Sequence, residues 1–464
     1  MLKVNQRLSP EVHKSTLKEL LTLAYPMVIS QGAFAVMIFT DRYFMSMVSP
    51  SHMAASLGGG VASFFCMSLF IGVLSYTNAL VAQYFGRDEW DKCSKVLTQG
   101  LILTLSFVPL LLLIGYVVSN LFEFMGHSPQ QAALEKKYFL ILIWGASISL
   151  CKTCIASYFS GIGETRVVMI ADTIGVAFNI PLSYALIFGA WGFPELGIAG
   201  AAYGTIISTL FSLLIFTHFY LKPQHMELFQ VRRSFRFDRG IINRFVRLGF
   251  PSGIEMFLNV AAFNLFLLMF QSYGIAEAAS AAIVFNWDII SFVPMLGLNV
   301  AIISLIGRYL GAGDTERMRE VMSAGFMLGM GYSFLLAIAF FVWREPLVSV
   351  FLDDAAQHTE ILTLSKFMMI GLATYVMADA LLIISGGVLR GAGDTKWLMW
   401  TSVLIHWFML LVQYFVIKVW DMGSRASWIV FVFMVLATAV IYMIRLYGGK
   451  WRTEEALARV MAEQ

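Results

Sequence analysis

Twelve long apolar segments are the feature that most constrains this chain. They cover residues 17–47, 53–84, 97–124, 137–160, 166–191, 197–221, 245–273, 279–309, 321–352, 361–388, 396–419 and 426–447. A helix needs about 20 apolar residues to cross a bilayer, and it satisfies its backbone hydrogen bonds within the segment. Such uniformly apolar runs differ from the alternating, shorter strands of a membrane β-barrel. We therefore predict an all-α polytopic membrane protein with twelve transmembrane helices.

The composition excludes several other classes of protein. Of the 464 residues, 59% are hydrophobic and 13% are charged, whereas about a quarter of a soluble domain is charged. The net charge of +3 is too balanced to indicate a nucleic-acid partner. Cys151 and Cys154 have CxxC spacing but lie in an apolar run without a second ligand pair, so we expect them to pack. No HExxH or GxSxG motif is present, so we expect neither an enzyme nor a cofactor.

Basic residues alternate with acidic ones from loop to loop. The basic side comprises Lys3, Arg7, Lys14 and Lys18, the loops after the second, eighth and tenth helices, the 222–244 loop, and the C-terminal tail. The opposite loops carry mainly acidic residues, namely Glu123, Glu135, Glu195, Glu277, Asp353, Asp354 and Asp421. The positive-inside rule then places both termini and the 222–244 loop in the cytoplasm.

The two halves of the chain repeat each other. Leu23-Ala-Tyr-Pro26 matches Leu248-Gly-Phe-Pro251, and Ala82-Gln-Tyr-Phe-Gly86 matches Gly307-Arg-Tyr-Leu-Gly311, both at an offset of 225. Gly161-Ile-Gly-Glu-Thr-Arg166 matches Gly391-Ala-Gly-Asp-Thr-Lys396 at an offset of 230. Because each half has an even number of helices, both begin on the same side of the membrane. We predict two six-helix lobes related by a pseudo-two-fold axis along the membrane normal, with a substrate cavity between them.

This repeat defines the predicted domain organisation. It consists of a cytoplasmic N-terminal segment (1–16), an N-lobe of helices 1–6 (17–221), a cytoplasmic linker (222–244), a C-lobe of helices 7–12 (245–448) and a cytoplasmic tail (449–464).

These same pieces, together with Asp41, resemble the MATE (multidrug and toxic compound extrusion) transporters, especially their bacterial NorM-like branch. The resemblance covers nearly the whole chain. It implies a transporter of the bacterial inner membrane that exports amphiphilic, often cationic compounds by alternating access, driven by Na⁺ or H⁺. We expect a monomer surrounded by membrane lipid. The alternative is a flippase for lipid-linked saccharides in the same superfamily, although such flippases more often have cationic cavities.

Placing an ionisable side chain within the membrane costs free energy, so the ionisable residues of the apolar segments are candidates for function. In the second half, the resemblance assigns Asp379 to the cation site and Tyr375 to the position beside it. The helix-seven glutamate of NorM-like proteins is replaced here by Asn259, and Glu255 stands one turn earlier on the same face. We expect the displaced carboxylate of Glu255 to reach the same cavity. Asp288 adds a third acid in the eighth helix.

Carboxylates and carbonyl oxygens are suitable ligands for Na⁺, and desolvated carboxylates are equally suitable for carrying H⁺. If the ion is Na⁺, we expect Asp379 and Glu255 to bind it. The alternative role of these acids is hydrogen bonding between helices.

In the first half, the resemblance assigns Asp41 to proton or drug binding, and Asn179 matches the family's helix-five asparagine. Asp172 lies seven residues before Asn179, which places both on one face of a helix. Some relatives have a carboxylate where this chain has Ser183, so a pair of carboxylates there is not expected. Asp172 either joins the N-lobe substrate or proton site or forms hydrogen bonds within the lobe.

Three further ionisable residues lie in apolar segments. Lys152 is deep enough to neutralise an acid, whereas Lys366 is near a helix end and can extend to the membrane surface. His406 is either a proton relay or a structural hydrogen-bonding residue.

Overall fold

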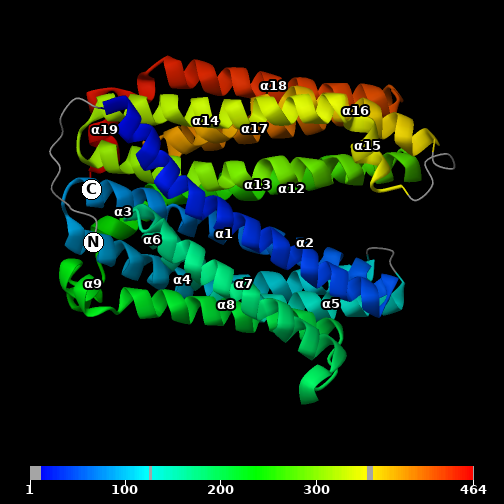
Figure 1. Ribbon diagram of the computed structural model, residues 1–464, viewed down its shortest axis with the longest axis horizontal. Coiled ribbons are helices and arrows are strands. Elements are labelled where there is room, and N and C mark those ends of the chain that lie inside the picture. The colour runs from blue at the N-terminus through cyan, green and yellow to red at the C-terminus, as the bar shows by residue number, and fades with distance from the viewer. Residues whose placement is uncertain (1–11, 125–127, 353–358, 463–464) are drawn as a thin grey trace.

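The structure is a computed structural model that describes residues 12–124, 128–352 and 359–462. Lys3, Arg7, Asp353 and Asp354 lie outside these residues. The described parts contain helices and connecting turns and no strand, which confirms the all-α prediction (Figure 1).

The linker (residues 222–244) separates the helices into two groups along the chain. Before it are α1 (Val12–Val48), α2 (Pro50–Ser75), α3 (Thr77–Gly86), α4 (Trp90–Ser119), η1 (Leu121–Phe124), α5 (Pro129–Trp144), α6 (Ala146–Gly161), α7 (Thr165–Phe188), η2 (Ala190–Gly192) and α8 (Ile198–Tyr220). The linker forms three short helices, α9 (Pro223–Leu228), α10 (Val231–Ser234) and α11 (Arg239–Arg244). After it are η3 (Phe245–Gly249), α12 (Phe250–Gln271), α13 (Ile275–Gly311), α14 (Thr315–Val342), α15 (Arg344–Ser349), α16 (Thr359–Gly391), α17 (Thr395–Tyr414), η4 (Phe415–Val419), α18 (Ser424–Tyr447), η5 (Lys450–Arg452) and α19 (Glu454–Met461).

Most of the predicted segments are membrane-spanning helices. Among the described residues, 11 helices are long and apolar enough to cross a bilayer, and α5 with α6 forms a twelfth span if this pair, bent by 48°, is one segment. Because α2 continues into α3 after a turn at Tyr76, the second segment contains two helices. Uniform apolarity predicts which segments span the membrane, because a helix surrounded by lipid needs apolar side chains along its length. It does not predict where a helix bends.

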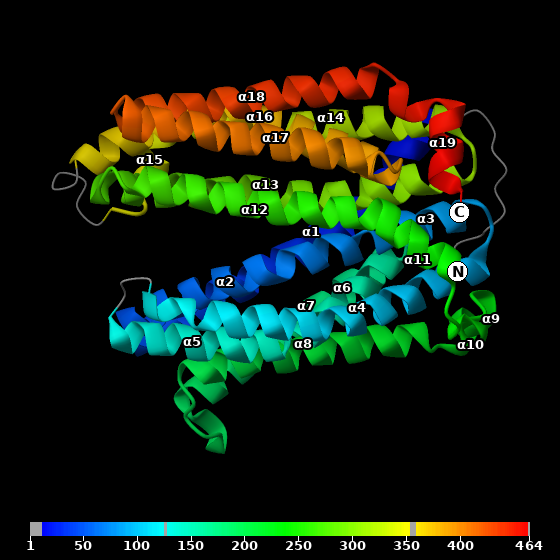
Figure 2. The same ribbon diagram turned by 180° about the vertical axis from the view of Figure 1, so that it is seen from behind.

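The helices form two bundles that meet at one end and diverge toward the other (Figures 1 and 2). One bundle contains α2 to α8 and the other contains α12 to α18. Helix α1 runs diagonally between them: its Leu20, Leu23 and Ala24 pack in one apolar cluster with residues of α13, α14 and α16, whereas its later part packs on α7. The segment 17–221 that we predicted as one lobe therefore begins with a helix that also contacts the second lobe.

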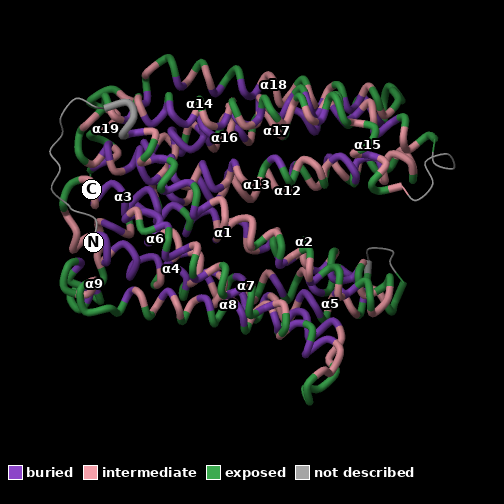
Figure 3. The backbone as a smooth tube through the Cα atoms, viewed as in Figure 1, coloured by how far each residue is buried: buried purple, intermediate pink, exposed green. Residues whose placement is uncertain are grey.

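The two bundles are joined by hydrogen bonds that we call the lobe junction. In each, a side chain of one lobe donates to a main-chain carbonyl of the other: Tyr76 to Arg390 (3.2 Å), Asn78 to Val300 (3.1 Å), Gln83 to Gly391 (3.0 Å), Ser304 to Ser160 (2.8 Å) and Arg308 to Ile162 (3.2 Å). Buried residues gather where α3, α6 and α13 meet (Figure 3). The junction lies at the end of the molecule that also holds α9 and α19.

The repeated glycines explain why the lobes approach so closely at this end. A Cβ atom on Gly86 would overlap the carbonyl oxygen of Arg308, and a Cβ atom on Gly311 would overlap the carbonyl oxygen of Gln83. Gly86 and Gly311 occupy matching positions in the sequence repeat, and so do Gln83 and Arg308, at an offset of 225. The repeat thus encodes a symmetric contact of main chain against main chain, for which only glycine leaves room.

The C-terminal tail contains an element that the sequence analysis did not predict. Helix α19 packs against the second lobe through the buried side chain of Met461. The side chain of Arg247 also donates to the Ala462 carbonyl oxygen (2.5 Å). Helix α19 was not predicted because its short sequence mixes polar and apolar residues and contains no long apolar segment.

Candidate functional site

Asp288, Tyr375 and Asp379 lie close together in the second lobe. Asp288 is on α13, and Tyr375 and Asp379 are one turn apart on the adjacent helix α16. The Tyr375 side chain is buried near both carboxylates, and its hydroxyl has no hydrogen-bond partner within the described chain. The carboxylates of Asp288 and Asp379 are close enough to interact electrostatically. Neither carboxylate has a basic ion-pair partner among the described residues, so two acids face each other without a countercharge.

Glu255 does not join this group. Its Oε1 atom lies 2.8 Å from an Nη atom of Arg390, and its side chain is buried. Arg390 follows Asp379 by eleven residues on α16, which is about 16 Å along a helix. The sequence analysis expected Glu255 to reach the cavity of Asp379, whereas the structure pairs it with an arginine beside the lobe junction. The two residues expected to bind Na⁺ together, Glu255 and Asp379, are thus at different depths.

Asn259 lies between these two levels and takes part in a polar cluster of its own. Its Nδ2 atom donates to the Ser402 hydroxyl at 2.7 Å, and the Nδ1 atom of His406 lies 2.7 Å from the Ser402 carbonyl oxygen. The Oδ1 atom of Asn259 is buried without a hydrogen-bond partner. Of the two roles considered for His406, these contacts match structural hydrogen bonding.

In the first lobe, Asp41 and Asn179 belong to one buried polar network. The Thr205 hydroxyl donates to Oδ2 of Asp41 at 3.0 Å, and Nδ2 of Asn179 lies 3.2 Å from the hydroxyls of both Ser183 and Ser208. The Oδ1 atoms of Asp41 and Asn179 are buried without a hydrogen-bond partner. No basic side chain in the described chain pairs with Asp41. The network therefore presents one carboxylate and one amide oxygen that are free to accept a proton, a cation or a polar group of a ligand.

Asp172 is separated from this network, although it is on the same helix as Asn179. Its Oδ1 atom lies 2.7 Å from Nζ of Lys152, and its Oδ2 atom accepts a hydrogen bond from Ser30. Lys152 therefore neutralises an acid, as we expected, and that acid is Asp172. These contacts match the interpretation of Asp172 as a residue that bonds within the lobe.

Sequence reasoning missed several members of these sites. Thr205, Ser183 and Ser208 hold Asp41 and Asn179, but hydroxyl residues are common in this chain and carry no individual signal. Arg390 was expected only as one of the basic residues that follow the tenth helix and orient the chain. Nothing in the sequence links it to Glu255, which is 135 positions away. Within the described residues, no group of three or more His, Cys, Asp and Glu side chains could hold a metal ion.

Comparison with known proteins identifies relatives that match most of the chain. The MatE family model matches residues 26–185 and 251–415, which are the two halves of the sequence repeat. The multidrug resistance protein MdtK of Edwardsiella ictaluri is 27% identical over 439 residues, covering 92% of this chain and 94% of that protein.

Solved structures show the same fold at low sequence identity. A MOP superfamily transporter from Pyrococcus furiosus matches with a TM-score of 0.85 at 18% identity, over 96% of both chains. The reverse polarity of the binding pocket of that transporter suggests a different function for it. An outward-facing multidrug resistance MATE family transporter matches with a TM-score of 0.84 at 19% identity, over 94% of this chain and 97% of that one. The chain belongs to the MatE family, whose members are membrane transporters and not enzymes.

Proposed function

We propose that this protein is a multidrug efflux transporter that exchanges Na⁺ or H⁺ for amphiphilic, often cationic organic compounds by alternating access. The observation that carries the proposal is the division of the intramembrane acids. Glu255 and Asp172 have basic partners, whereas Asp41, Asp288 and Asp379 have none among the described residues. An unpaired ionised carboxylate inside the membrane is costly, so it favours a state in which a proton or a cation is bound.

The pair in the second lobe is suited to bind the coupling ion. Asp288 and Asp379 repel each other when both are ionised, and a shared proton or one monovalent cation relieves this repulsion. The buried hydroxyl of Tyr375, which has no hydrogen-bond partner within the described chain, can donate to either carboxylate. Coupling requires that ion and drug prefer different conformations of the protein.

The network around Asp41 is suited to a different task. It lies in the other lobe, and its free oxygens can accept hydrogen bonds from a ligand or attract a cationic one. We propose that it binds the exported compound or a proton. The homologue MdtK, a bacterial multidrug resistance protein, supports export over the alternative of lipid-linked saccharide transport. We further propose a monomer without a cofactor, in the bacterial inner membrane with both termini in the cytoplasm.

Ethidium transport in membrane vesicles tests this function. We expect the parent protein to transport ethidium only when a Na⁺ or H⁺ gradient is imposed. D379N and D288N each remove one carboxylate, so we expect gradient-driven transport to fall at least about tenfold while the protein remains folded. E345Q is the matched control, because Glu345 is exposed and pairs with Lys366 outside the site (2.6 Å). Transport that ignores both gradients in the parent protein contradicts the proposal.

A further inference from the structure

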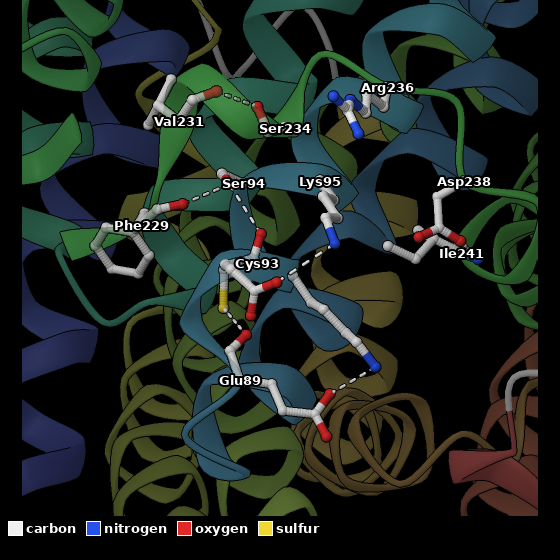
Figure 4. A network of polar contacts seen from close by, with 12 residues as sticks. Glu89, Cys93, Ser94, Lys95, Phe229, Val231, Ser234, Arg236, Asp238 and Ile241 are labelled. Carbon is white, nitrogen blue, oxygen red and sulfur yellow. Dashed lines mark hydrogen bonds and ion pairs between the residues drawn. The ribbon is translucent and has the colours of Figure 1, made fainter. Parts of the chain in front are cut away.

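The 222–244 linker is fixed on the surface of the first lobe. Ser94 of α4 donates a hydrogen bond to the carbonyl oxygen of Phe229 at 2.7 Å (Figure 4). Gln99, one turn further along α4, donates to the carbonyl oxygen of Arg236 at 2.8 Å and accepts from the amide of Asp238 at 3.2 Å. The side chains of Ser94 and Gln99 are buried. These bonds hold the main chain of the linker in one position against α4.

A second set of contacts holds the start of the linker. The Nε2 atom of His225 lies 2.9 Å from the Tyr158 hydroxyl. The imidazole ring also packs among the rings of Tyr220, Phe159 and Phe229, with ring centroids 5.4, 5.7 and 4.5 Å away. Both parts of the linker are therefore anchored, and the side chains between the anchors project from a fixed backbone.

Between α4 and this fixed backbone is a cavity of about 480 Å³, which we call the linker cavity. It is lined by Asp91, Lys95, Gln230, Arg233 and Arg236. Lys95 lies 3.3 Å from Asp91, so these two charges offset each other. Arg233 and Arg236 are exposed and form no ion pair within the described chain. The linker cavity thus has two arginines without a countercharge.

Exposed aromatic side chains flank these arginines. Phe235 and Phe237 are each 67% exposed, on both sides of Arg236 in the sequence. The linker begins just after the span that ends at Tyr220, and the next span begins at Arg239, so these residues lie beside the membrane. Aromatic rings favour the boundary between lipid headgroups and acyl chains. A free anion in water gains nothing from two exposed phenyl rings, whereas a phospholipid contacts both kinds of group.

We propose that the linker cavity binds the phosphate group of an anionic phospholipid. Arg233 and Arg236 bind the phosphate oxygens, because a guanidinium group donates two parallel hydrogen bonds to such an anion. Phe235 and Phe237 contact the upper acyl chains. Basic clusters next to a membrane span attract anionic lipids of the nearby leaflet. This inference concerns a site remote from the intramembrane acids and is independent of the proposed transport function.

Lipid titration of the full-length protein, followed by native mass spectrometry, tests the proposal. We expect the parent protein to bind phosphatidylglycerol more tightly than phosphatidylcholine. Each arginine contributes about a fivefold factor in affinity near an anionic headgroup, so R233Q/R236Q should bind phosphatidylglycerol about 25-fold more weakly. The control K396Q/K450Q removes two exposed positive charges from outside the cavity and should bind it as the parent does.

Two further measurements separate lipid from other anions. F235S/F237S should weaken phosphatidylglycerol binding and leave the protein folded, since both rings are exposed. Inorganic phosphate at the same concentration should not displace the lipid. Equal phosphatidylglycerol binding by the parent and R233Q/R236Q overturns the proposal. Displacement by inorganic phosphate, or unchanged binding by F235S/F237S, overturns the assignment of a lipid.

Discussion

The acids inside the membrane fall into two physical kinds. Asp172 and Glu255 each touch a basic side chain, at 2.7 and 2.8 Å, and are structural ion pairs in this conformation. Asp41, Asp288 and Asp379 have no such partner within the described residues. Removing the basic partner of an acid of the first kind leaves its charge uncompensated, whereas removing an acid of the second kind takes away a proposed binding group. The two kinds therefore respond differently to substitution.

The Lys152–Asp172 pair shows the structural kind. We expect K152M to lower the free energy of unfolding by on the order of 2 kcal/mol, because Asp172 is left without its countercharge in a largely buried place. K152M/D172N should recover most of this loss, since no charge remains. K366M is the control, because water screens the Lys366–Glu345 pair at the surface and its loss should have a much smaller effect. Thermal unfolding in detergent measures all three, and no recovery in K152M/D172N contradicts the interpretation.

Individual residues also mark the limit of what the sequence predicts. The acids were predicted because charges are scarce in apolar segments, and each stands out alone. Their partners were harder to find: Arg390 is 135 positions from Glu255, and only the fold brings the two together. The nearness of Tyr375 to Asp379 was predictable because both lie on one helix, one turn apart.

At the scale of elements, the presence and order of the membrane-spanning helices were predictable, whereas their exact ends and their breaks were not. The α5–α6 bend of 48° occurs at Gly145, where a Cβ atom would overlap the side chain of Ile206 on α8. A bend of this kind depends on a neighbour more than 60 residues away. The linker was predicted as polar and basic, but its docking on α4 depends on buried side chains of another segment, such as Gln99.

The docking of α9 should depend on pH. Burial lowers the pKa of His225 from 6.5 to about 4, so the folded linker favours the neutral imidazole. Stabilisation from this residue is therefore present above pH 6.5 and is lost as the pH falls toward 4. We expect hydrogen exchange in residues 222–234, corrected for the intrinsic rate, to be faster at pH 5 than at pH 7. H225F keeps an aromatic ring and should remove this difference, whereas H52F, at the other end of the molecule, should retain it.

At the scale of the whole molecule, the lobe junction holds the two bundles together at one end while they diverge at the other. The proposed alternating access requires that this junction open and that the far ends approach. The repeat predicted the two lobes and their symmetry from the sequence alone. It did not predict which end is closed, because both conformations must be compatible with the same sequence.

Adding one methyl group at the junction should shift the balance between conformations. A Cβ atom in G311A overlaps the Gln83 carbonyl oxygen, so the lobes must separate there at a cost of about 1–3 kcal/mol. We expect spin labels at the exposed positions Asp88 and Glu316, one on each lobe, to report a longer distance in G311A. G331A is the control, because a Cβ atom at Gly331 meets no atom within 4 Å. An unchanged distance distribution in G311A contradicts this role of the junction.

The acceptors at the lobe junction have a consequence for how this protein tolerates mutation. All five bonds of the junction end on main-chain carbonyl oxygens, which every amino acid possesses. Substitution of Val300 or Ile162 leaves these acceptors in place, whereas substitution of Asn78 or Arg308 removes a donor. The positions that supply the acceptors can therefore be substituted without loss of these hydrogen bonds. A saturation mutagenesis map of this interface should be one-sided, with intolerant donors facing permissive acceptor positions.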